Sequence, residues 1–153
     1  YRSRKDDRIL SQEINLLADI TGKVVTASRQ HFLIMQLPTT YRRLLSAGIT
    51  DDYTMGFADR IGYRAGTGHS FHWYDIENET ATPLKIHPFV MMDATLRRYM
   101  KLNVKQAVEK VVEFKKIARK YEVPLTVLWH NSSLGEDGEW KGWRQVYEII
   151  LSH

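Results

Sequence analysis

The sequence predicts an α/β fold in which most strands are parallel, and two observations indicate it. Helical and strand-like segments alternate along the first third of the chain, which is the order of elements in a parallel sheet with crossover helices. Short apolar runs are also followed at once by polar residues, as at the carboxyl ends of buried strands. The 153 residues suffice for a sizeable core, and we expect a single domain over residues 1–153.

The first third of the chain predicts a helix, a strand and a second helix. The first helix is expected from Asp6 to Gly22, because apolar residues recur between them at three- and four-residue spacing and glycine commonly ends a helix. A strand over residues 23–27 follows, since Lys-Val-Val-Thr is rich in β-branched residues. The second helix is expected to begin at Pro38 and to end at Gly48.

The middle of the chain predicts mainly strands. A short strand is expected within residues 49–56. Residues 70–76 and 84–91 have strand composition, and the polar segment 77–80 between them is typical of a turn. A short helix is expected over residues 94–101.

The last third predicts the longest helix, a buried strand and a closing helix. Asn103 should cap the long helix, and Gln106 at the third helical position completes an amide variant of the capping box. The strand is expected over residues 125–128, where an apolar run follows Pro124, and the closing helix over about 140–151.

Composition narrows the classes of function. The net charge is +4, but the basic residues are spread along the chain, so we expect no nucleic-acid partner. The chain has no cysteine, which excludes disulfides, thiolate zinc sites and cysteine nucleophiles. No apolar run approaches the roughly 18 residues of a membrane span, so we expect no membrane partner. The chain begins at Tyr1 rather than Met, without a signal-peptide pattern, and we expect it to be part of a longer protein.

Three predicted strands end in polar residues, at Arg29 and His31, at Arg64, and at His130. Because the carboxyl ends of parallel strands meet at one edge of a sheet, a shared pocket is expected there. Arg29 is suited to a carboxylate or phosphate, or to orienting a catalytic carboxylate. His31 could ligate a metal, move a proton or bind a substrate. The alternative is that both residues pair only with structural groups.

Further candidates lie near these strand ends. Asp51 and Asp52 are adjacent on a strand and should point to opposite faces, and we favour Asp52 as the one that faces the pocket. Arg64 lies among small residues that permit close approach of a ligand. His130, with Trp129 beside it, is placed for acid–base chemistry, or else is a buried histidine bonded to the backbone. The remaining histidines show no metal-binding spacing and are taken as structural or surface residues: His69, His72, His87 and His153.

Five short motifs follow one another between residues 29 and 131, within a likeness that runs from about residue 9 to the end of the chain. They are Arg-Gln-His-Phe-Leu, Pro-x-Thr-Tyr-Arg-x-Leu, Gly-Ile-x-x-Asp-Tyr-x-Met-Gly, Gly-Tyr-Arg-Ala-Gly-Thr and Trp-His-Asn. In this order they resemble one branch of the polysaccharide deacetylases, found in bacteria of the Bacteroides type. The resemblance implies a distorted (β/α) barrel. Since a full barrel needs about 250 residues, this chain would form a partial one, roughly its second half.

The resemblance also implies a reaction and roles for residues. The family hydrolyses acetyl groups on acetylated polysaccharides, or related non-peptide carbon–nitrogen bonds, with a divalent metal that is most often zinc. Arg29 matches the arginine that orients the base, Asp52 the carboxylate that tunes the catalytic histidine, and His130 that histidine, the general acid. Arg64, Trp129 and His31 are then expected to contact the glycan substrate.

The chain departs from the family in two respects. The Thr-Phe-Asp-Asp strand and the histidine loop that supply most metal ligands are absent, so we expect them upstream of Tyr1. The usual Arg-Pro-Pro-Tyr pattern is replaced by Arg-Gln-His-Phe, which makes His31 the only candidate metal ligand in this chain. The expected partners are therefore a missing N-terminal half or a second copy. A bacterial cytoplasm or cell envelope is the expected location, and an inactive glycan-binding or scaffold domain of the same fold is the alternative function.

Overall fold

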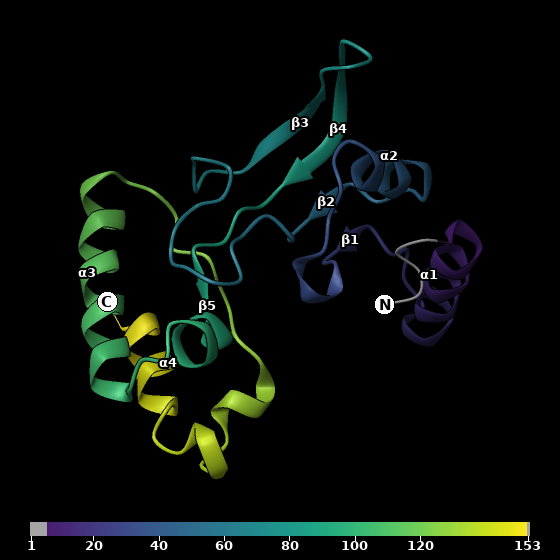
Figure 1. Ribbon diagram of the computed structural model, residues 1–153. Helices are drawn as coiled ribbons and strands as arrows, with labels where there is room; N and C mark the ends of the chain where they lie inside the picture. The colour runs from purple at the N-terminus through teal and green to yellow at the C-terminus, as the bar shows by residue number, and fades with distance from the viewer. Residues whose placement is uncertain (1–5, 153) are drawn as a thin grey trace. The chain divides into compact units, whose positions relative to one another are not determined.

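The computed structural model describes residues 6–152 and has a mixed α/β architecture (Figure 1). The chain divides into two compact units. The first unit is Tyr1–Met55 with Ser70–Pro88, and the second is Gly56–His69 with Phe89–His153. The predicted α/β class with mostly parallel strands is confirmed, whereas no closed barrel forms within residues 6–152.

The first unit is built on a four-stranded sheet in the order β1 (Ala27–Ser28), β2 (Asp51–Asp52), β4 (Thr80–Ile86) and β3 (Phe71–Asp75). Strands β1, β2 and β4 run parallel, and β3 is antiparallel to β4. The predicted strand at 23–27 contributes only its last residue to the sheet. The three parallel strands end level with one another, because Ser28 pairs with Asp52 and Asp52 pairs with Ile86.

Two helices belong to the first unit. Helix α1 (Asp7–Thr21) is capped by the Asp6 side chain and ends at Gly22 in the left-handed conformation, as predicted. Helix α2 (Thr39–Ser46) buries Tyr41 and Leu44. The expected loop between β1 and α2 contains a short 3₁₀ helix, η2 (His31–Leu33).

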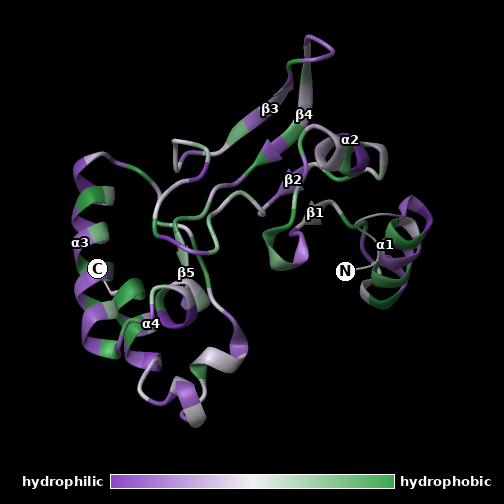
Figure 2. Ribbon diagram, in the orientation of Figure 1, coloured by the Kyte–Doolittle hydropathy of each residue, from purple (hydrophilic) through white to green (hydrophobic). Residues whose placement is uncertain are grey.

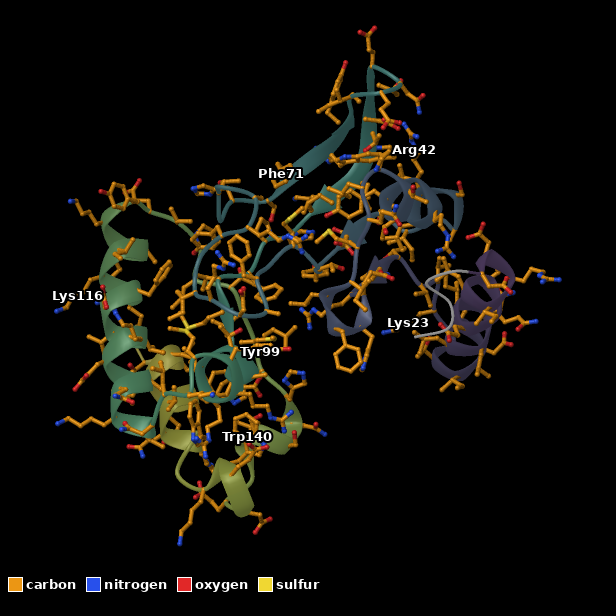
Figure 3. The ribbon with its side chains drawn as sticks, in the orientation of Figure 1. Lys23, Arg42, Phe71, Tyr99, Lys116 and Trp140 are labelled. Carbon is orange, nitrogen blue, oxygen red and sulfur yellow. The ribbon has the colours of Figure 1, made fainter. Side chains whose placement is uncertain are left out.

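An ion pair ties the β3–β4 hairpin to α2. The Arg42 guanidinium donates two hydrogen bonds of 2.7 Å to the Asp75 carboxylate and lies 3.0 Å from Glu77 (Figure 3). The Arg42 hydrogen bond lowers the pKa of Asp75 to about 2, with a further contribution from Asn78.

This pair predicts a pH dependence of stability. A carboxyl group whose pKa is lower in the folded protein stabilises the fold above its unfolded value, near 3.9, and loses that contribution as the pH falls through about 2. We expect the melting temperatures of the wild type and Asp75→Asn to differ most above pH 5 and to converge toward pH 2. A difference that stays constant from pH 7 to pH 2 would contradict this ionic link.

The second unit contains a two-stranded parallel sheet, β5 (Met91–Met92) and β6 (Val127–Leu128). Its other elements are the π-helix η3 (Thr95–Tyr99), α3 (Val104–Lys120), η4 (Asn131–Leu134), η5 (Gly138–Trp140) and α4 (Arg144–Leu151). The capping box of Asn103 and Gln106 at α3 is confirmed. Figure 2 shows hydrophobic residues alternating with hydrophilic ones along α3. Buried residues of these elements form one core: Val90, Met91, Leu96, Ala107, Val111, Trp140, Trp143, Val146 and Ile150.

The strand predicted over residues 84–91 is wrong in its extent. Strand β4 ends at Ile86, and β5 begins at Met91 in a different sheet. Pro88 lies between them, and proline has no N–H group to donate to a continuing ladder. No helix within residues 6–152 is long and apolar enough to cross a membrane.

Candidate functional site

The second unit contains a histidine held by a fully buried carboxylate. Asp93 is 0% exposed, and its Oδ1 lies 2.6 Å from the Nδ1 atom of His130. The carboxylate also accepts hydrogen bonds from the backbone N–H groups of His130 (2.9 Å) and Ala94 (2.7 Å) and from the Ser133 hydroxyl. Both oxygens of Asp93 are therefore occupied by donors, and the carboxylate is fixed in place.

The parallel pairing of β5 and β6 brings these residues together. Met92 pairs with Leu128, so the chain leaves both strands at the same edge of the small sheet. Asp93 follows β5 directly, and His130 follows β6 after one intervening residue. Strand ends that meet at one edge commonly carry the polar groups of a site.

The hydrogen bonds of Asp93 determine which nitrogen of His130 is available. Because the carboxylate accepts a hydrogen bond from Nδ1, the neutral ring carries its proton there, and Nε2 is left to exchange protons with a ligand. The His130 side chain is 52% exposed, while its partner is completely buried. This arrangement is suited to general acid–base chemistry at Nε2.

Two other predicted site residues belong to the second unit. Trp129 is half-buried against the core and packs on Tyr147, with ring centroids 5.6 Å apart. Its buried Nε1 atom has no hydrogen-bond partner among the described residues. Arg64 is exposed in the loop between Gly62 and Gly66 and has no hydrogen bond with His130.

Arg29 and Asp52 belong to the first unit. Asp52 is 0% exposed and accepts hydrogen bonds from the backbone N–H (3.0 Å) and hydroxyl (2.7 Å) of Thr54. Burial raises the pKa of Asp52, and the bonds from Thr54 and the charge of Arg29 oppose that rise. Arg29 donates from Nε to the Tyr53 carbonyl at 3.2 Å. The carboxylate that contacts His130 is Asp93. The role that the family resemblance implies for Asp52 stays a prediction, because Asp52 and His130 belong to different units.

His31 and Arg29 line an open pocket of about 310 Å³ in the first unit. The other lining residues come mainly from α1, β1 and α2 and are largely apolar: Leu10, Glu13, Ile14, Leu17, Val25, Ala27, Ser28, Gln30, Ile34, Leu44 and Ile49. Arg29 and His31 therefore line the same pocket. The predicted common pocket with Arg64 and His130 stays a prediction, because those residues belong to the other unit.

The described residues do not by themselves form a metal centre. Within residues 6–152, no three His, Asp or Glu side chains lie close enough together to hold a metal ion. Transition-metal sites usually need three or four such ligands. Among the described residues, His31 does not belong to a group of three side chains that could hold a metal ion. The divalent metal therefore stays a prediction. His153, which the sequence predicted to be a structural or surface residue, lies outside the described residues.

Sequence reasoning found His130 but missed Asp93 and Ser133. Asp93 directly precedes the short helix that is predicted over residues 94–101. The signal that could have identified it is its position, since it ends the Val90-Met91-Met92 run in the same way that His130 ends the later apolar strand. Ser133 carries no comparable signal, because its contact depends on the fold of η4.

The fold and this cluster define an α/β protein with an aspartate–histidine pair at the ends of two parallel strands. Comparisons of the chain with protein-family models, characterised proteins and solved structures give no match.

Proposed function

We propose that Asp93 and His130 form the acid–base pair of a hydrolase that removes acetyl groups from an acetylated polysaccharide or cleaves a related non-peptide carbon–nitrogen bond. The observation that carries this proposal is the 2.6 Å contact between a fully buried carboxylate and a histidine whose ring is half exposed. The order of the sequence motifs described above supports the choice of substrate class.

The pair would act when the acetyl group is cleaved from the sugar. Expulsion of an amine or alkoxide requires a proton, which the Nε2 atom of His130 is placed to give. While that proton is held, the ring is cationic, and the Asp93 carboxylate stabilises the cation and keeps the ring oriented. Arg64, exposed in the same unit, is suited to contact polar groups of a glycan.

A divalent metal, zinc in the first place, remains part of the proposal as a cofactor of the intact protein. At least part of its ligand set would come from outside residues 6–152, since no group of three candidate ligands lies within them. The acid–base role proposed for His130 rests on its contact with Asp93 and not on the metal.

The alternative is a glycan-binding or scaffold domain that has lost the chemistry. The observation that favours it is the lack of a ligand set among the described residues, together with His31 in place of the family's proline. This alternative predicts binding of an acetylated glycan with no release of acetate.

The test is acetate release from an N-acetylated oligosaccharide and an O-acetylated polysaccharide by the full-length protein supplied with zinc. We expect release by the wild type and a loss of at least about 10²-fold in kcat for His130→Ala, because general acid–base groups contribute about 10²–10⁴-fold. His72→Ala, which removes an exposed histidine, is the matched control and should retain activity. Undiminished release by folded His130→Ala would refute the proposal, and binding without release would establish the alternative.

A further inference from the structure

A second histidine–carboxylate pair, His87 and Asp51, occurs in the first unit, and a serine hydroxyl contacts its histidine. The Ser70 hydroxyl lies 2.8 Å from Nδ1 of His87, and Nε2 of His87 lies 2.7 Å from Oδ1 of Asp51. The three residues are separate in sequence and come from three neighbouring strands or strand ends. The sequence predicted His87 to be a structural or surface residue.

The register of the sheet explains this alignment. Phe71 pairs with Ile86, so Ser70 faces His87 one step beyond the ends of β3 and β4. Asp51 pairs with Lys85, which places Asp51 on the same face of the sheet as His87, because side chains alternate along a strand. Asp52 is on the opposite, buried face.

The hydrogen bonds assign a role to each group. Asp51 accepts from Nε2 of His87 and from the Thr50 hydroxyl at 2.7 Å, and the His87 bond is the main reason that the pKa of Asp51 is lowered. Since Nε2 carries the proton toward Asp51, the lone pair of Nδ1 is free to accept the hydroxyl proton of Ser70. A hydroxyl, an imidazole and a carboxylate are thus linked in the order that activates a serine nucleophile. The two ring nitrogens of His87 are exchanged relative to the usual Ser-His-Asp triad, in which the serine contacts Nε2 and the aspartate contacts Nδ1.

The imidazole is held rigidly, while the serine is accessible. The Tyr53 ring stacks on His87 with centroids 4.4 Å apart and an interplanar angle of 9°. Arg29 lies 5.8 Å from the Tyr53 ring centroid. The His87 side chain is only 18% exposed, whereas Ser70 is an exposed residue. A fixed base beside an accessible hydroxyl is the geometry that nucleophilic catalysis requires.

We propose that Ser70, His87 and Asp51 form an acyl-transfer site, separate from the Asp93–His130 pair, that reacts with carboxylic esters. The Ser70 Oγ atom forms a bond to the acyl carbon, and its proton passes to Nδ1 of His87. The bond between the acyl carbon and the ester oxygen then breaks, and the alcohol leaves with that proton. Water activated by the same nitrogen hydrolyses the seryl ester, which releases the acid and restores Ser70.

The test uses a reagent that traps serines activated in this way. The full-length protein is incubated with diethyl p-nitrophenyl phosphate in the presence of EDTA, and the modified residue is located by peptide mass spectrometry. Attack by Ser70 releases p-nitrophenolate and leaves a diethylphosphoryl group on Oγ. We expect labelling of Ser70 in the wild type, none at this position in Ser70→Ala, and labelling slower by about 10²-fold or more in His87→Gln and Asp51→Asn.

The controls separate an activated serine from a structural hydrogen bond. Ser46→Ala removes an exposed serine that donates to the Arg42 carbonyl. In this variant the reagent should label Ser70 at the wild-type rate. Circular dichroism shows whether each variant is folded. If His87→Gln does not fold, the labelling rate of Asp51→Asn is compared with that of the wild type instead. An unlabelled Ser70 in the wild type, or equal labelling rates in the wild type and a folded His87→Gln or Asp51→Asn, would overturn the proposal.

Discussion

Replacement of Asp93 by alanine is expected to lower the free energy of unfolding by about 3–5 kcal/mol, because several donors lose their shared acceptor. The backbone N–H of Ala94 and the hydroxyl of fully buried Ser133 both donate to this carboxylate. Each buried donor left without a partner costs about 1–3 kcal/mol. The loss is measured by urea denaturation of the wild type and the variant at pH 7.

The matched control for this substitution is Asp59→Ala in the same unit. Asp59 is exposed and, among the described residues, forms an ion pair with its neighbour Arg60, so its removal should leave the free energy of unfolding close to that of the wild type. Equal stability of Asp93→Ala and Asp59→Ala would show that the Asp93 hydrogen bonds do not hold the second unit together.

Trp143→Ala is expected to destabilise the second unit by about 3–5 kcal/mol, the usual cost of truncating a buried large aromatic side chain. Trp143 is 2% exposed and belongs to the main core of that unit. Its ring also makes an edge contact with Trp140, with centroids 5.6 Å apart. Alanine would leave a cavity that this core cannot fill without moving α3 and α4. The loss of stability is measured by thermal and urea unfolding of the wild type and the variant.

The control for the tryptophan is Tyr121→Ala, which truncates an aromatic side chain that is 62% exposed. Its removal should cost less than about 1 kcal/mol, because little apolar surface leaves contact with the protein. A loss as large as that of Trp143→Ala would contradict the placement of the core.

The helices were the part of the fold that sequence patterns predicted best. Helix α1 runs between its Asp6 cap and Gly22, and α3 has the expected capping box of Asn103 and Gln106. These signals are local, since a cap bonds to N–H groups two or three residues away. Strand bounds depend on partners distant in sequence, and the predicted strand 84–91 accordingly divides at Pro88 between two sheets.

The candidate sites were predictable as single residues but not as pairs. His130 was expected at a strand end, yet its partner Asp93 becomes adjacent only through the pairing of β5 with β6. The alternation of side chains correctly places Asp51 and Asp52 on opposite faces. The sequence contains no sign of which face is covered, and Asp52, the favoured residue, is on the buried one. The pairing of β4 with β2 and with β3 likewise makes His87 part of a cluster.

The central claim is that Asp93 holds His130 with Nε2 available for proton transfer, and the tautomer of His130 tests it most directly. We would measure ¹⁵N chemical shifts of both ring nitrogens in protein labelled with ¹⁵N-histidine, with His130→Gln used to assign the signals. At a pH where the ring is neutral, the proton is predicted to reside on Nδ1 in the wild type, and Asp93→Asn should abolish this preference. A proton on Nε2 in the wild type would contradict the account.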